Sequence, residues 1–133
     1  MILDKQNIFS DGQAITATAD STNIIDLGST RMGEGEPIPL NIQVEESFTA
    51  AGAATLTVSV LCDDNEAFSS AQTLYTSPAI GKATLVKGYR LPGFSTLPIG
   101  TERYIKLVYT VATGPMTTGK INAALVLAQQ TNV

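Results

Sequence analysis

The sequence of 133 residues contains no histidine and no tryptophan, and it has a single cysteine, Cys62. Without histidine, Ser-His-Asp catalysis, Cys-His catalysis and the common metal sites lose their usual base or ligand. One cysteine cannot form a disulfide within the chain, and Cys62 continues an apolar alternation that predicts a buried, unreactive thiol. We therefore expect no enzyme activity, no catalytic residue, no bound cofactor and no metal ligand.

Long apolar runs and positive charge are also scarce. No run approaches the roughly 18 residues of a membrane-spanning helix, and residues 1–12 lack the basic region and apolar core of a signal peptide. Charged residues make up only 15% of the chain, and its net charge is −4. The net negative charge would repel a polyanion, so we expect no direct nucleic-acid binding. Because no apolar run is long enough to span a membrane, we also expect no membrane partner. The single cysteine and the missing signal peptide indicate that the chain folds in a reducing cytosol.

The few charges are unevenly distributed along the chain. Eleven acidic residues face two basic ones up to Glu66, whereas one acidic residue faces six basic ones after it. Strands from the two halves could interleave in the fold, so that the charges cancel in space, or the two halves could form complementary assembly faces. The sequence leaves both interpretations open.

The clearest pattern that is present is an alternation of apolar and hydroxyl residues over 55–62 (TLTVSVLC). A strand with one buried face requires this period of two. The run 103–111 (RYIKLVYTV) repeats it, and its inward face carries Ile105, Leu107, Tyr109 and Val111. Both runs are rich in β-branched residues, which favour strands. They predict the two central strands of one hydrophobic core.

Six further segments have the composition of strands, and glycine, proline or polar turn residues separate them. These segments are 13–19, 23–27, 39–44, 71–77, 84–89 and 121–128. Eight short strands without a convincing helix predict an all-β fold, an antiparallel two-sheet sandwich, with an eight-stranded jelly roll favoured over an immunoglobulin-like roll. We expect an N-terminal arm at 1–12, a single jelly-roll domain at 13–128 and a polar tail at 129–133.

Two segments hold large apolar side chains without a strand period, the arm and the loop 90–100. The arm is either a first strand or coil on the chain's own sheet or a segment that docks on a neighbour. The loop either covers the core or meets a partner. On the second interpretation of each, the candidate partner-interface residues are Ile2, Leu3, Phe9, Leu91, Phe94 and Leu97.

The densest acidic cluster is Asp63, Asp64 and Glu66. Calcium takes oxygen ligands from such runs, but the glycine and the distant glutamate of a helix-loop-helix calcium loop are missing. We therefore expect a solvated turn. Jelly rolls also serve as carbohydrate-binding modules, for which Tyr75, Tyr89 and Tyr104 are possible stacking residues; the absence of tryptophan makes this alternative weaker.

Several blocks taken together resemble the capsid cement protein family of tailed bacteriophages, of the Bordetella-phage type. The blocks are MILDKQNIFSDGQAIT, STNIIDLG, GEGEPIPL, DDNEAFSS, KGYRLPG and LPIGTERYIKLVYTV, and they span nearly the whole chain in order. The resemblance implies a non-enzymatic jelly-roll protein, often a homodimer, that binds the outside of an assembled icosahedral head and cements major capsid protein subunits. It also implies a place on the capsid exterior of the virion, after synthesis in the host bacterial cytoplasm.

Overall fold

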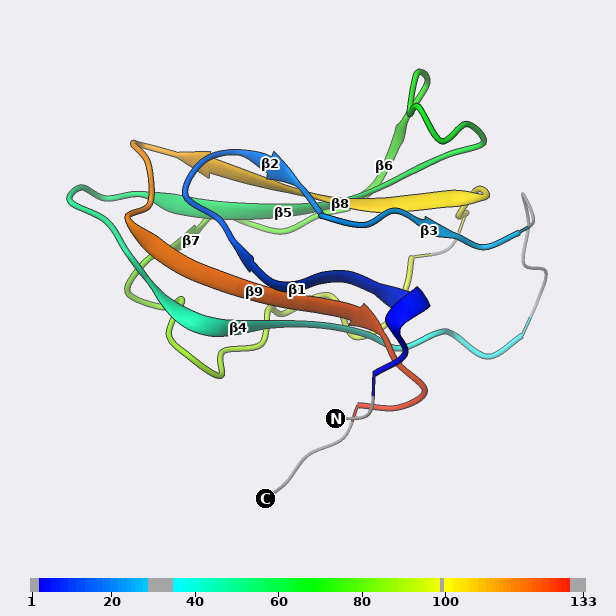
Figure 1. Cartoon of the computed structure of the whole chain (residues 1–133), viewed down its shortest axis with the longest axis horizontal. Coiled ribbons are helices and arrows are strands. Elements are labelled where there is room, and N and C mark those ends of the chain that lie inside the picture. Colours follow the sequence, from blue (N-terminus) through cyan, green and yellow to red (C-terminus); the bar gives the residue numbers. More distant parts are fainter. Residues whose placement is uncertain (1–2, 29–34, 99, 130–133) are drawn as a thin grey trace.

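The computed structural model describes residues 3–28, 35–98 and 100–129 (Figure 1). These ranges contain nine strands, one 3-10 turn (η1, Lys5–Asn7) and no α-helix, which confirms the all-β prediction. The strands are β1 (Ile8–Ala14), β2 (Ala19–Asp20), β3 (Ile25–Asp26), β4 (Leu40–Thr49), β5 (Thr55–Asp63), β6 (Gln72–Thr76), β7 (Ile80–Gly81), β8 (Tyr104–Ala112) and β9 (Thr118–Leu125). No helix of the described ranges is long and apolar enough to span a membrane.

The strands form two antiparallel sheets that lie one above the other (Figure 1). One sheet has the order β1-β9-β4. The other has the order β2-β8-β5-β6, with β3 also paired to β8 and β7 also paired to β5. Two sheets packed face to face in this way are a sandwich, as the sequence predicts.

The order of the strands is that of a jelly roll. β2 and β3 pair with successive stretches of β8, and β7 and β6 do the same along β5, so each pair acts as one interrupted strand. An irregular segment, 85–97, runs along the free edge of β4, where Leu40 N donates to Ser95 O and Phe48 N donates to Leu85 O. If β2 with β3, β7 with β6, and the segment 85–97 each count as one strand, the chain has eight strands. One layer then has the order β1, β9, β4 and 85–97, which are the first, eighth, third and sixth strands. The other layer has β2 with β3, β8, β5, and β7 with β6, which are the second, seventh, fourth and fifth strands, and this is the order of a jelly roll.

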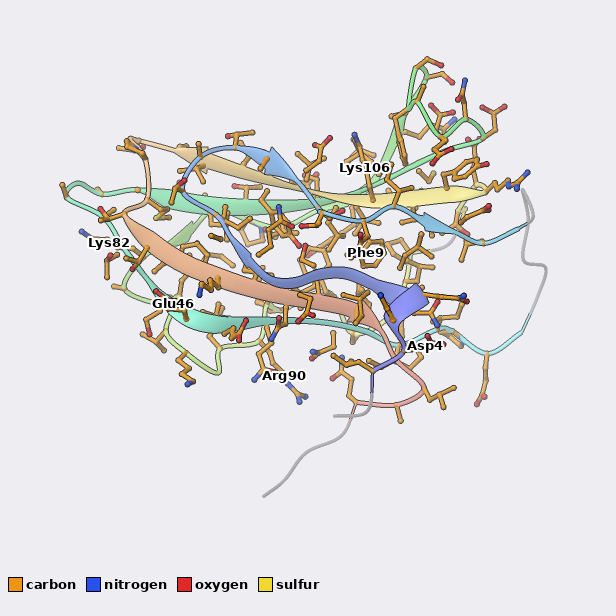
Figure 2. The ribbon with its side chains drawn as sticks, viewed as in Figure 1. Asp4, Phe9, Glu46, Lys82, Arg90 and Lys106 are labelled. Carbon is orange, nitrogen blue, oxygen red and sulfur yellow. The ribbon has the colours of Figure 1, made fainter. Side chains whose placement is uncertain are left out.

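The two central strands are where the alternation places them. β5 and β8 pair without a break from Thr55↔Ala112 to Asp63↔Tyr104, and the inward residues of β5 are completely buried. Tyr109 of β8 is also buried, and its hydroxyl lies 2.7 Å from Ser10 Oγ of β1, across the core. Burial raises the pKa of Tyr109 well above its ordinary value. Phe9 of β1 lies between the two sheets as well (Figure 2).

Two predicted segments near β1 and β4 have the wrong bounds. β1 begins at Ile8 and pairs with β9, so much of the predicted arm is the first strand of the chain's own sheet. β4 continues to Thr49, five residues beyond the predicted end of this strand at residue 44. Register shifts interrupt the pairing of both strands with β9. A bulge adds one residue to a strand and breaks the period of two that the sequence analysis relied on.

The predicted strand 84–89 is wrong as a regular strand. Turns occur at 82–84 and 87–88, and Gly88 has a φ of 89°. The segment nevertheless lies against β4, because Lys87 N donates to Ser47 Oγ and Val44 N donates to Tyr89 O. The segment therefore lies where an edge strand beside β4 would lie, but its turns prevent regular strand pairing.

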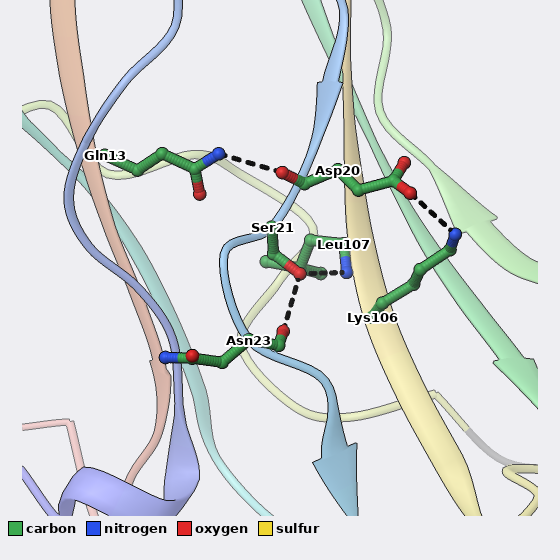
Figure 3. A network of polar contacts seen from close by, with 6 residues as sticks. All are labelled: Gln13, Asp20, Ser21, Asn23, Lys106 and Leu107. Atoms are coloured by element: carbon green, nitrogen blue, oxygen red, sulfur yellow. Dashed lines mark hydrogen bonds and ion pairs between the residues drawn. The ribbon is translucent and has the colours of Figure 1, made fainter. Parts of the chain in front are cut away.

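The charge asymmetry of the sequence is reduced by interleaving. Each ion pair found among the described residues joins an acidic residue of the first half to a basic residue of the second: Asp26–Arg103 at 2.9 Å, Asp20–Lys106 at 2.8 Å and Glu46–Lys120 at 3.3 Å. Figure 3 shows the second pair, beside Ser21 Oγ, which donates to Asn23 O and accepts from Leu107 N. Exposed pairs of this kind are worth about 0–1 kcal/mol each, so they contribute little to stability.

Candidate docking surface

The structure corrects the predicted partner interface. Phe9, Leu91, Phe94 and Leu97 are between 0 and 8% exposed and belong to the chain's own core. The ring of Phe94 packs edge-on against Tyr75, with 5.0 Å between the ring centroids. These four residues are therefore not exposed anchors, because the apolar loop closes the sandwich beside β4. Of the remaining two candidates, Leu3 is exposed and Ile2 lies outside the described residues. Residues 130–133 of the predicted tail also lie outside them.

The outer side of β4 carries two hollows instead. Leu40, Ile42 and Val44 are buried, so the residues between them face away from the core. The first of the two hollows, which we call the Asn41 hollow, has a volume of about 230 Å³. It is lined by Leu40, Asn41, Ile42, Arg90, Leu91, Pro92, Gly93, Phe94, Ser95 and Gln129. The second, the Lys120 hollow, has a volume of about 410 Å³ and is lined by Glu45, Glu46, Ser47, Lys87 and Lys120.

The Asn41 hollow forms where the segment 85–97 leaves the edge of β4. Leu91 N still donates to Ile42 O, and Ser95 O accepts from Leu40 N, but Pro92 and Gly93 between them turn away. Pro92 has no N–H to donate to the strand, and Gly93 has a φ of 83°. Arg90 extends away from the two sheets (Figure 2). The hollow is a consequence of the loop that replaces a regular edge strand.

Large exposed apolar side chains lie near both ends of β4. Val86 is 51% exposed and follows Leu85, whose carbonyl accepts from Phe48 N. Leu127 is fully exposed and follows Val126, whose N–H donates to Pro39 O. We call the two hollows together with Val86 and Leu127 the β4 surface. Hollows beside exposed apolar side chains are the kind of surface on which protein partners dock.

The predicted acidic turn is only partly solvated. Asp63 is completely buried, and it accepts hydrogen bonds from Ser70 N, Ser70 Oγ and Asn65 N. Carboxylate oxygens of Asp63, Asp64 and Glu102 lie within 4.8 Å of one another. Glu102 could not be assigned to this cluster from the sequence, because only the pairing of Asp63 with Tyr104 brings the start of β8 beside the end of β5.

Two opposing effects act on the carboxyl of Asp63. Burial acts to raise its pKa, but the hydrogen bonds from Ser70, Asp64 and Asn65 together outweigh it and lower the pKa below its ordinary value. The hydrogen bond with Asp63 raises the pKa of Asp64. Asp63 thus holds its own loop together, and this accounts for its burial without a ligand.

We predict that the melting temperature is the same with chelator and with millimolar calcium. The oxygens of Asp63 already accept hydrogen bonds from the loop 65–70, so an ion would have to displace them. Thermal melting followed by circular dichroism checks this. A rise of several degrees with calcium would mean that an ion binds the native state, and would assign Asp63, Asp64 and Glu102 as its ligands.

The remaining sequence candidates have structural partners. Cys62 is buried, as predicted, and burial raises the pKa of its thiol. The Arg103 guanidinium lies 5.1 Å from the ring centroid of Tyr104, and Tyr75 contacts Phe94. Tyr89 packs against the core. Because Tyr75 and Tyr89 both pack against the core, less of each ring is available to stack on a sugar.

The fold and the β4 surface define a small jelly-roll sandwich with a hollowed outer side. The family model Bbp16 matches residues 9–125, and the chain belongs to the Bbp16 family. No curated protein matches the sequence.

Proposed function

We propose that this protein is a non-enzymatic capsid cement protein that binds the outside of an assembled phage head and holds major capsid protein subunits together. The observation that carries the proposal is the extent of the family match, 9–125, which includes nearly all of the sandwich from β1 to β9. Much of the sequence that resembles cement proteins lies in this range. The proposal includes a homodimer as the binding form and the capsid exterior as the location.

The physical properties of the chain suit this role. A cement protein must stay soluble until it binds, which a net charge of −4 supports. It must then bury part of its surface against the shell, and the centre of an interface is poor in charge. Only 15% of the residues of this chain are charged, although Glu45, Glu46, Lys87 and Lys120 line one hollow of the β4 surface. Because many copies engage one repeating lattice, modest individual contacts give strong retention.

We further propose that the β4 surface faces the shell. A few side chains that fill pockets carry most of the binding energy of an interface, and the β4 surface has hollows and exposed apolar side chains for such contacts. The opposite outer side, on β5 and β8, consists of regular paired strands, with Thr57 opposite Thr110 and Ser59 opposite Val108.

The test uses purified phage heads that lack this protein and measures how much added protein sediments with them. We expect wild-type protein to be retained and Val86→Asp to be retained at least tenfold less, because Asp places a charge in the apolar part of the β4 surface. Wild-type protein and Val86→Asp should melt within a few degrees of each other, because the side chain of Val86 is half exposed. The matched control is Thr57→Asp, which places the same charge on the opposite outer side.

Two results would contradict the proposal. Heads that retain no wild-type protein would exclude the cement role. Loss of retention in Thr57→Asp, with Val86→Asp retained normally, would keep the role but place the shell contact on the β5 and β8 side.

A further inference from the structure

Two sheets have four margins, and within the described residues three of these margins are bonded to a neighbouring segment. The margin of β4 is bonded to the segment 85–97. The margins of β1 and of β2 with β3 are bonded to each other, because Phe9 O accepts from Asn23 N and Asp20 O accepts from Gln13 Nε2. The fourth margin is β6, which pairs with β5 on one side. No backbone hydrogen bond joins the other side of β6 to a described residue.

The sequence of β6 leaves this edge open to pairing. Proteins usually protect an exposed strand edge with charged side chains or proline, and residues 71–77 contain neither. Among the described strands of five or more residues, β6 alone has no buried residue. Leu74 and Tyr75 pack against the core only in part. The edge therefore presents free backbone groups beside apolar side chains that the chain itself does not fully cover.

The two ends of the edge carry opposite charge. The loop between β5 and β6 projects from the molecule (Figure 1) and carries Asp64 and Glu66, both exposed, without a basic residue. Lys106 and Arg103 lie near this loop, but they are already paired with carboxylates of β2 and β3. The first charged residue after β6 is Lys82. An identical edge that runs antiparallel thus brings the acidic end of one copy toward the basic end of the other, whereas a parallel edge brings like charges together.

We propose that β6 pairs antiparallel with β6 of a second copy of this chain about a two-fold axis. The inference rests on the proposed function, whose homodimer it assigns to one strand edge. Antiparallel pairing of identical strands sets the two-fold axis perpendicular to the sheet. The β4 surfaces of both copies then face the same way, so both can face the shell at once.

The length of the edge sets the strength of the dimer. β6 has five residues, and a register shift leaves Leu74 as an extra residue within it, so only a few backbone bonds can form between two copies. Such an interface falls below the roughly 1,200–2,000 Å² that stable complexes bury. We therefore expect a dissociation constant in the micromolar range, and a repeating shell strengthens such a contact because many copies bind together.

The first test compares wild-type protein with Thr76→Pro by sedimentation over a series of concentrations, in the absence of heads. Ser77 N donates to Val58 O of β5, so the N–H of the adjacent Thr76 points away from β5, toward the free edge. Proline removes this donor and is tolerated on an edge. We expect the dissociation constant to rise by about tenfold or more. The substitution also removes the exposed contact of Thr76 Oγ1 with Ser59 Oγ, so in dilute solution the variant should melt within a few degrees of wild type.

Thr73→Lys is a second variant that leaves the backbone unchanged. Thr73 is exposed in β6, and a lysine on an edge strand discourages pairing, so we expect the same loss of dimer. The matched control is Thr110→Lys, which places the same charge at an exposed position of β8, inside the sheet and away from the margin. It should sediment as wild type does.

Four results would overturn the inference. Wild-type protein that stays monomeric at millimolar concentration would do so, although its retention on heads would still support the cement role. A dimer that survives both Thr76→Pro and Thr73→Lys would place the interface elsewhere. An equal loss in Thr110→Lys would place it on the outer side of β5 and β8. A monomer whose edge variants lose retention on heads would show that β6 pairs with a strand of the shell protein.

Discussion

Val58→Asp is expected to abolish cooperative folding, whereas Thr57→Asp is expected to melt close to wild type. Val58 is completely buried in β5, between the two sheets and opposite Tyr109 of β8. A carboxylate at this position would lie in the hydrophobic core, and no lysine or arginine of the described ranges is buried there. Burying a carboxyl without partners, whether it stays charged or takes up a proton, costs several kcal/mol. The lost packing of Val58 adds to this cost, and the net stability of a domain of this size is only roughly 5–15 kcal/mol.

Thr57 is the matched control, because it is the adjacent residue of the same strand and faces the outer side. Asp at this position remains in contact with water, and surface substitutions away from special features usually change stability by only about 0.5 kcal/mol. Circular dichroism melting and the dispersion of amide NMR signals distinguish the two variants. Similar melting curves for both would show that the buried and outer faces of β5 are reversed.

Gly119→Ala is expected to lower the melting temperature by roughly 10 °C or more, which corresponds to a loss of about 2–5 kcal/mol. Gly119 lies in β9 with a φ of 143°, a conformation that other residues rarely adopt. A Cβ atom at this position would overlap the ring carbons of Phe48, which is buried at the end of β4. Backbone strain and overpacking therefore act together.

Gly81→Ala is the control for the loss of glycine alone, because a Cβ at Gly81 would meet no atom within 4 Å. Its melting temperature should stay near that of wild type. Combining Gly119→Ala with Phe48→Leu should restore part of the lost stability relative to the sum of the two single variants, because the smaller side chain makes room for the Cβ. Strict additivity of the two changes would show that the ring of Phe48 is not what makes glycine necessary.

Several features could be predicted from the sequence because they depend on neighbouring residues only. An uninterrupted alternation identifies β5 and β8, and it also predicts the burial of Cys62 and Tyr109. The frequent turn residues indicate many short strands and hence a sandwich. β1 and β4 were predicted less well, because bulges break their alternation at positions that the sequence does not mark.

The candidate docking surface could not be predicted in this way. The apolar loop that contains Phe94 has no periodicity, so its sequence is equally suited to closing a core and to meeting a partner. Pairing between distant segments decided that it closes the core, since its backbone bonds to β4 leave its apolar side chains inside. The same pairing left a hollow over Asn41 and brought Glu102 beside Asp63.

The sequence by itself thus determined the all-β class, the two central strands and the buried thiol, because the period of side chains along a strand is a local property. The tertiary structure alone decided which apolar side chains remain exposed and which polar atoms lack a partner. Both depend on the surface that one segment covers on another far along the chain, and no local pattern records that.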